Sequence, residues 1–140
     1  MLLNSIAFQS PIFYWARTHR IHHKYSDTDA DPHNATRGFF FSHVGWIFTT
    51  KHPDFKVARS KIDTSDLRND PVVMFQKKYY GILVLLCCFV IPTLTPVYLW
   101  GESLKNGWFV VTMFRFVATL NVTFSINSVA HVFGSKPYDK

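Results

Sequence analysis

A stretch of about 22 residues without a charged side chain, from Tyr79 to Trp100, constrains the fold of this chain more than any other feature. At a rise of 1.5 Å per residue, a helix of that length crosses a hydrocarbon core of roughly 30 Å. A soluble chain of 140 residues would have to bury the whole stretch in one modest core. The sequence therefore predicts a transmembrane helix over residues 79–100.

A second apolar segment, residues 107–126, is almost as long and is interrupted by Arg115. The loop between the two segments is short and holds Glu102 and Lys105, so the sequence predicts an antiparallel transmembrane hairpin. An ionised side chain is costly at this depth, so we expect Arg115 to face protein or water and not lipid.

The basic residues indicate how the hairpin is oriented. Most of the 15 Lys and Arg residues lie between Arg17 and Lys78, and Lys136 and Lys140 follow the second span. The positive-inside tendency then places these flanks in the cytosol and the short loop in the lumen. The net charge of +6 could also suggest nucleic-acid binding. The basic residues are mixed with acidic ones and no nucleic-acid fold signature is present, so no nucleic-acid partner is expected.

The predicted fold class is all-α: an integral membrane helical protein with a two-helix hairpin and a cytosolic helical cap. The expected organisation is the end of an earlier transmembrane helix over 1–14, a cytosolic region over 15–78, transmembrane helices over 79–100 and 107–126, and a cytosolic exit over 127–140.

Three histidines, His19, His22 and His23, have the spacing i, i+3, i+4. On a helix this spacing places the three imidazoles on one face, so they can approach a metal ion from one side. Imidazole suits iron, copper, nickel and zinc, so the cluster alone does not select the metal. The alternative is a solvated basic patch shared with Arg17, Arg20 and Lys24.

A second element, Asn127 and His131, lies where the second span ends, and the two residues are one helical turn apart. A histidine at a membrane edge can also be an interfacial anchor. The hairpin, however, returns His131 to the side where His19 to His23 are expected. A metal bound on that side would explain both elements.

Several segments, in the same order along the chain, resemble the membrane acyl-CoA desaturases of the stearoyl-CoA, or delta-9, class. Their residues resemble those of arthropod members most. The matching segments are HRIHHKYSDTDADPHN (19–34), RGFFFSHVGW (37–46), KHP (51–53), DPVVMFQKKYY (70–80) and NSVAHVFGSKPYDK (127–140). This resemblance implies a multi-pass enzyme of the endoplasmic reticulum membrane with its histidine boxes and two iron ions on the cytosolic side. Such an enzyme removes two hydrogens from a fatty acyl-CoA, using O2 and electrons from cytochrome b5 and its reductase.

The resemblance also implies roles for individual residues, and no catalytic group beyond the metal ligands. His19, His22, His23 and His131 match iron ligands, and Asn127 matches a residue that holds iron through a water molecule. Gln9, Trp15 and Thr123 match positions that shape the bend of the acyl tunnel, and Arg17 and Lys51 match basic residues that meet the CoA phosphates. His33, His43 and His52 match no ligand. Thr18 and Thr50 depart from the pattern, since an acid and a second basic residue are usual there.

The family pattern also requires a His-x4-His box upstream and a His-x2-His-His box downstream, and neither occurs in this sequence. We therefore expect an incomplete sequence that is inactive by itself. The alternatives are an inactive truncated paralogue, a related di-iron membrane lipid hydroxylase, and a non-enzymatic membrane protein that associates through the hairpin.

Overall fold

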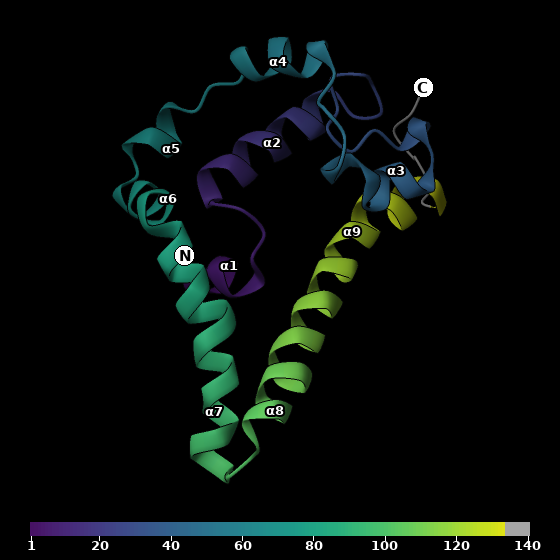
Figure 1. Cartoon of the computed structure of the whole chain (residues 1–140). Coiled ribbons are helices and arrows are strands. Elements are labelled where there is room, and N and C mark those ends of the chain that lie inside the picture. The colour runs from purple at the N-terminus through teal and green to yellow at the C-terminus, as the bar shows by residue number, and fades with distance from the viewer. Residues whose placement is uncertain (134–140) are drawn as a thin grey trace. The chain divides into compact units, whose positions relative to one another are not determined.

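The computed structural model describes residues 1–133. These residues form helices joined by turns and contain no strand, which confirms the all-α prediction (Figure 1). The helices are α1 (Leu2–Ala7), α2 (Ile12–Lys24), η1 (Ala35–Arg37), α3 (Phe39–His43), η2 (Gly45–Ile47), α4 (Pro53–Ser60), α5 (Ser65–Asn69), α6 (Pro71–Val84), η3 (Leu85–Val90), α7 (Ile91–Trp100), α8 (Leu104–Asn106), η4 (Gly107–Phe114) and α9 (Arg115–Phe133).

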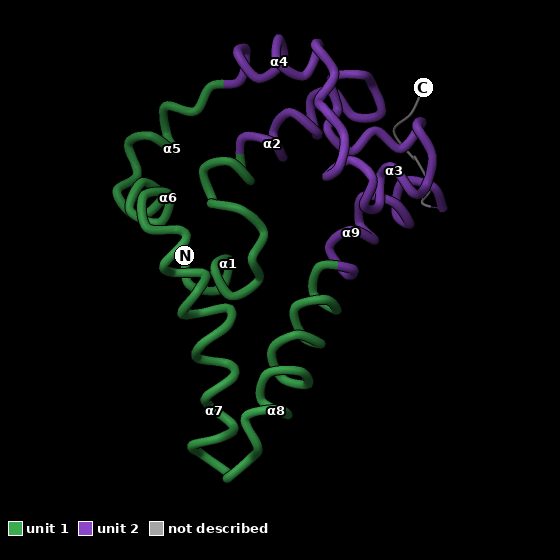
Figure 2. Tube along the Cα trace, viewed as in Figure 1, with its two compact units in different colours: residues 1–16, 63–120 green, residues 17–62, 121–140 purple. Residues whose placement is uncertain are grey.

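The chain divides into two compact units, each made of two separate segments (Figure 2). Unit 1 contains residues 1–16 and 63–120, and unit 2 contains residues 17–62 and 121–140. Of unit 2, the structure describes residues up to Phe133, so the end of the expected exit, 134–140, lies outside the described residues.

Two helical stretches of 30 residues, Pro71–Trp100 and Leu104–Phe133, are long and apolar enough to cross a membrane. Most of their apolar surface is exposed, unlike that of a core helix in a soluble protein. Both stretches are longer than the predicted spans. The first begins at Pro71 because the Asp70 carboxylate caps the helix, accepting hydrogen bonds from the backbone N–H groups of Val72 and Val73 at 2.7 and 3.1 Å.

The α7 and η4 segments pack against each other in unit 1, as the predicted hairpin requires. A Cβ atom at Gly107 would clash with the backbone carbonyl of Thr93, so only glycine permits this close approach. The buried hydroxyls of Thr93 and Thr112 are 2.8 Å apart across the same contact. Small residues with a buried hydrogen bond are typical of helix pairs in membranes. Gly101 ends α7 in the left-handed conformation, with φ of 71°, and so allows the chain to reverse.

Arg115 is bound by protein atoms, which confirms its expected environment. Its guanidinium donates to the carbonyl oxygen of Ile6 at 3.0 Å and to that of Cys88 at 2.7 Å. Pro92, four residues after Cys88, has no N–H to donate to the Cys88 carbonyl. The charge on Arg115 is thus used within unit 1 to hold the segment at Ile6 against the hairpin.

Residues 1–14, expected to form the end of an earlier transmembrane helix, are divided between two helices. Helix α1 ends at Ala7 and is followed by Phe8, whose φ of 52° is left-handed, and α2 begins only at Ile12. The completely buried side chain of Gln76 joins these pieces to α6. Its carbonyl accepts from the Ile12 N–H at 2.8 Å, and its amide donates to Asn4 Oδ1 at 2.6 Å.

Unit 2 is built on a small apolar core of Ile21, Ala30 and Ala58, with Tyr25, Phe55 and Ile62 packed around it. Ile21 is fully buried, and it lies in α2 between the histidines of the cluster. Packing of this one side chain therefore sets the rotation of α2 and the direction in which the neighbouring histidines point.

Candidate metal centre

His19 and His23 face each other on successive turns of α2. Their Nε2 atoms are 3.0 Å apart, and their rings stand edge to face with centroids 4.4 Å apart. Two neutral nitrogens at this distance need either a shared proton or a common metal ion. For a metal–nitrogen distance of roughly 2.1 Å, two ligands at about 90° lie about 3.0 Å apart. The pair therefore has the spacing of two adjacent ligands on one ion.

The electrostatics of α2 also favour the form of histidine that binds metal. Burial lowers the pKa of His19, and repulsion from His23 and then His22 lowers it further. A lowered pKa keeps the imidazole neutral at pH 7, with a lone pair available for coordination.

His22 is oriented by a carboxylate. Its Nδ1 lies 2.9 Å from Asp31 Oδ1, and both residues are buried. The carboxylate accepts this hydrogen bond, so Nδ1 carries the proton and Nε2 keeps the lone pair. A carboxylate behind a histidine is the usual support of a metal-ligating imidazole.

Asp31 is itself held in place by the turn that follows α2. Backbone N–H groups of Asp27 and His33 donate to its two oxygens, each at 2.9 Å. Burial raises the pKa of Asp31, but the hydrogen bonds from His22, His33 and Asp27 outweigh burial and leave the pKa below its usual range. Asp31 is therefore ionised at neutral pH.

His131, from α9, joins the cluster as the hairpin argument predicted. Its ring centroid is 5.0 Å from that of His22, and its Nδ1 is 3.5 Å from Asp27 Oδ1. The centre thus contains two histidine–carboxylate pairs, His22 with Asp31 and His131 with Asp27. Asn127 lies one turn before His131 on the same helix.

The sequence patterns indicated no role for Asp27 or Asp31 and gave His33 no ligand match. The ring of His33 is 5.4 Å from that of His22, and His22, Asp31 and His33 form a group whose spacing could hold an ion. Burial lowers the pKa of His33 to about 4, so this imidazole is neutral as well. The sequence feature that could have indicated these carboxylates is the alternation of Asp27, Asp29 and Asp31 shortly after the histidine cluster.

The two other histidines without a ligand match have contacts of a different kind. His43 joins α3 to α9, with Nδ1 2.8 Å from Ser128 Oγ and Nε2 3.3 Å from Asn121 Oδ1. His52 precedes α4 and accepts the Asp54 N–H through Nδ1 at 3.3 Å. Asp29, His52 and Asp54 form an exposed group of possible ligands outside the histidine cluster.

Lys51, expected to meet CoA phosphates, lies in unit 2 with its ammonium group 3.0 Å from the Trp46 carbonyl oxygen and 4.5 Å from the centre of the Trp46 ring. Burial lowers its pKa to about 8, and repulsion from Arg37 adds to the shift. Lys51 and Arg37 line a small pocket whose lining is mixed. It also includes the carboxylates of Asp29 and Asp31 and the apolar side chains of Pro32, Phe41 and Phe55.

The remaining expected substrate residues are divided between the units. Gln9 lies in the break between α1 and α2, and Trp15 is part of α2; both belong to unit 1. Arg17 on α2 and Thr123 on α9 belong to unit 2.

Comparison with known proteins identifies the family of this chain. The fatty acid desaturase family model matches residues 1–140. An acyl-CoA Delta-9 desaturase of Acheta domesticus is 61% identical over 140 residues, which is all of this chain and 39% of the relative. Stearoyl-CoA desaturase 5 of Bos taurus is 61% identical over 137 residues, 98% of this chain and 41% of the relative. A (11Z)-hexadec-11-enoyl-CoA conjugase of Bombyx mori is 58% identical over 140 residues, all of this chain and 42% of the relative.

This chain therefore spans about 40% of the length of the curated relatives that it matches. The family implies iron, and the clustered histidines of unit 2, with His22 held by the Asp31 carboxylate, fit that metal. Together with the two helices that are long enough to cross a membrane, the match over all 140 residues shows that the chain belongs to the fatty acid desaturase family.

Proposed function

We propose that this chain forms part of a fatty acyl-CoA desaturase that inserts a double bond into a saturated acyl chain at a centre of two iron ions. The observation that carries the proposal is the convergence of His131, from the end of α9, on the α2 histidines. Residues that are more than 100 positions apart meet at one place. A shared metal site requires its ligands to converge in this way. A solvated basic patch has no such requirement.

The proposed ligands are His19, His22, His23 and His131, with Asn127 acting through a water molecule. Asp31 and Asp27 would hold His22 and His131 in the tautomer that leaves a lone pair for the metal. His19 and His23 are exposed at the edge of the cluster, so further ligands from the same protein can approach from that side.

The bound iron would supply the oxidising power that amino-acid side chains lack. The overall reaction would reduce O2 to two molecules of water. It would take two hydrogens from the acyl chain, and two electrons and two protons from outside. The electron donors would be cytochrome b5 and its reductase. The residues of this chain hold the metal and position the substrate, and position decides which carbon–carbon bond is oxidised.

For the substrate, Arg17 and Lys51 would bind the CoA phosphates through charge-assisted hydrogen bonds. Gln9, Trp15 and Thr123 would shape the bend of the acyl tunnel. By the positive-inside tendency, the basic flanks of the two helical stretches would place the histidines in the cytosol. The resemblance to membrane acyl-CoA desaturases suggests the endoplasmic reticulum as the membrane.

The test uses a transcript that joins this chain to the two histidine boxes that the family pattern requires, expressed in a yeast strain without its own desaturase. His22→Ala and His131→Ala should each abolish monounsaturated product, and the purified proteins should lose iron. Lys61→Ala, at an exposed position after α4, is the control and should retain both. Product formation that survives His131→Ala, with iron retained, would contradict the shared centre, and a hydroxylated product would show a different reaction.

A further inference from the structure

Outside the metal centre, the start of α6 in unit 1 holds a hollow with a mixed lining. The hollow has a volume of about 700 Å³. Its lining combines two basic residues with aromatic and aliphatic ones: Tyr14, Pro71, Met74, Phe75, Lys77, Lys78 and Tyr79. A lining that combines two lysines with apolar side chains matches a ligand that has a negatively charged head and a hydrocarbon body.

Aromatic rings hold the two ammonium groups beside the hollow. Lys77 Nζ lies 4.1 Å from the centre of the Phe13 ring and 5.3 Å from that of Tyr14. Lys78 Nζ lies 5.2 Å from the centre of the Tyr79 ring. Within residues 1–133 no carboxylate forms an ion pair with either lysine. Their charge is therefore available to an external anion.

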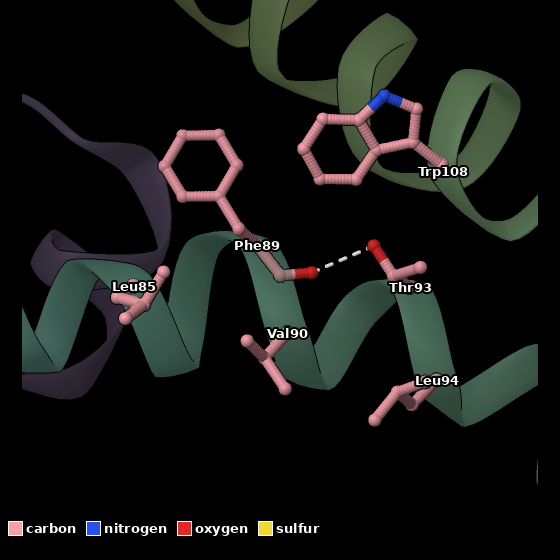
Figure 3. A pocket seen from close by; sticks show the side chains of 6 residues that line it. All are labelled: Leu85, Phe89, Val90, Thr93, Leu94 and Trp108. Atoms are coloured by element: carbon pink, nitrogen blue, oxygen red, sulfur yellow. Dashed lines mark hydrogen bonds between the residues drawn. The ribbon is translucent and has the colours of Figure 1, made fainter.

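Further along the same helical stretch, apolar side chains are exposed on both sides of a kink at Tyr79, where φ is −105° and ψ is 16°. Phe75, Ile82 and Leu85 are 50%, 60% and 57% exposed. Leu85 also lines a second hollow of about 430 Å³, whose lining is otherwise Phe89, Val90, Thr93, Leu94 and Trp108. Figure 3 shows the rings of Phe89 and Trp108 beside each other at this hollow, with centroids 6.2 Å apart.

The separation of the two hollows agrees with the depth of one membrane leaflet. Phe89 follows Lys78 by 11 residues, which span at most roughly 16 Å at the α-helical rise of 1.5 Å per residue, because the stretch contains the kink at Tyr79 and the π-helical segment Leu85–Val90. One leaflet contributes about half of a hydrocarbon core of roughly 30 Å. A lipid with its phosphate at Lys78 would thus place the end of a tail near Phe89.

We infer that unit 1 carries a binding site for an anionic glycerophospholipid, with the headgroup at Lys77 and Lys78 and one tail along Ile82 and Leu85 toward Phe89 and Trp108. The charge of the two lysines favours an anionic lipid over a neutral one. Anionic lipids are concentrated in the cytosolic leaflet, and the proposed orientation places the start of α6 on that side. The site is separate from the metal centre of unit 2 and needs no iron.

The site can be tested with the intact chain in nanodiscs of phosphatidylcholine with a minor fraction of phosphatidylserine. Native mass spectrometry after release from the discs measures how much of each lipid remains bound. We expect preferential retention of phosphatidylserine. Each lysine near an anionic surface contributes about a fivefold gain in affinity, so Lys77→Gln with Lys78→Gln should reduce retention by roughly 25-fold.

Two matched variants separate site binding from a general effect of charge. Lys56→Gln with Lys61→Gln removes the same charge from exposed positions on and after α4 and should leave retention unchanged. Lys77→Arg with Lys78→Arg preserves the charge and should retain the lipid, which also shows that substitution there does not unfold the helix.

Three outcomes would overturn the inference: equal retention of phosphatidylserine and phosphatidylcholine, equal loss in the Lys56 and Lys61 variant, or complete displacement by water-soluble glycerophosphoserine. The last result would identify a site for soluble phosphates without a tail. Because iron and activity are not measured, failure of this experiment leaves the desaturase proposal intact, and failure of that proposal does not affect lipid retention.

Discussion

The hairpin of unit 1 and the histidine cluster of unit 2 use polar groups in opposite ways. In the hairpin, isolated polar groups satisfy one another across an apolar contact, as the Thr93 and Thr112 hydroxyls do at 2.8 Å. In the cluster, carboxylates use their hydrogen bonds to orient imidazoles whose other nitrogen remains available, as Asp31 does for His22. The hairpin is therefore complete without a ligand, whereas the cluster is arranged to receive one.

The largest effect should come from Gly107, because any side chain there meets the backbone of α7. We expect Gly107→Val to destabilise the hairpin by about 3 kcal/mol, since a backbone carbonyl cannot move aside as a flexible side chain can. Thermal unfolding followed by circular dichroism in detergent measures this loss. Gly81→Val is the control, because a Cβ atom at Gly81 meets nothing within 4 Å. Equal stability of both variants would show that the close approach of α7 and η4 is not important.

The cluster should respond most strongly to loss of its buried carboxylate. Asp31→Asn keeps the size of the side chain but removes the charge that orients and polarises His22, so we expect iron(II) affinity to fall about 10- to 100-fold. Competition with a chelator of known affinity measures the change. Asp66→Asn on α5 is the control, since Asp66 is exposed and belongs to neither group of possible ligands among the described residues. Unchanged affinity in Asp31→Asn would mean that His22 does not bind the metal.

A smaller effect is expected from the hydroxyl pair in the hairpin. Thr93→Val with Thr112→Val replaces both partners by groups of similar shape, so the loss should be about 0.6 kcal/mol or less. Thr93→Val alone should cost more, because it leaves the Thr112 hydroxyl buried without this partner. If the single and double variants are equally stable, the hydroxyls do not interact.

The smallest effect should be the pH dependence of phosphate binding at Lys51. Burial lowers the pKa of this lysine to about 8, so its charge is fully present well below pH 8 and is lost as the pH rises through 8. If Lys51 binds a CoA phosphate, CoA affinity should fall a few-fold over that range by calorimetry. Lys51→Arg should remove the pH dependence, because arginine stays charged. A decrease that persists in Lys51→Arg would point to another group.

The contacts of His43 illustrate what could not be inferred from the sequence. The sequence pattern indicated only that His43 does not match a metal ligand, and it gave no other role for this side chain. Its contacts with Ser128 and Asn121 join residues about 80 positions apart and hold α9 where His131 emerges. No periodicity in the sequence reports contacts of that range, because helical spacing describes one element at a time.

Local patterns alone determined the helical class, the two apolar stretches, the hairpin between them and the shared face of His19, His22 and His23. These features depend on hydrogen bonds and spacings within a single helix, which the order of residues specifies directly. Only the tertiary structure decided the break at Phe8, the binding of Arg115 to the carbonyls of Ile6 and Cys88, and the carboxylates that support the histidines. Each of these depends on which distant backbone groups and side chains packing brings within a few ångströms, and that is a property of the folded chain.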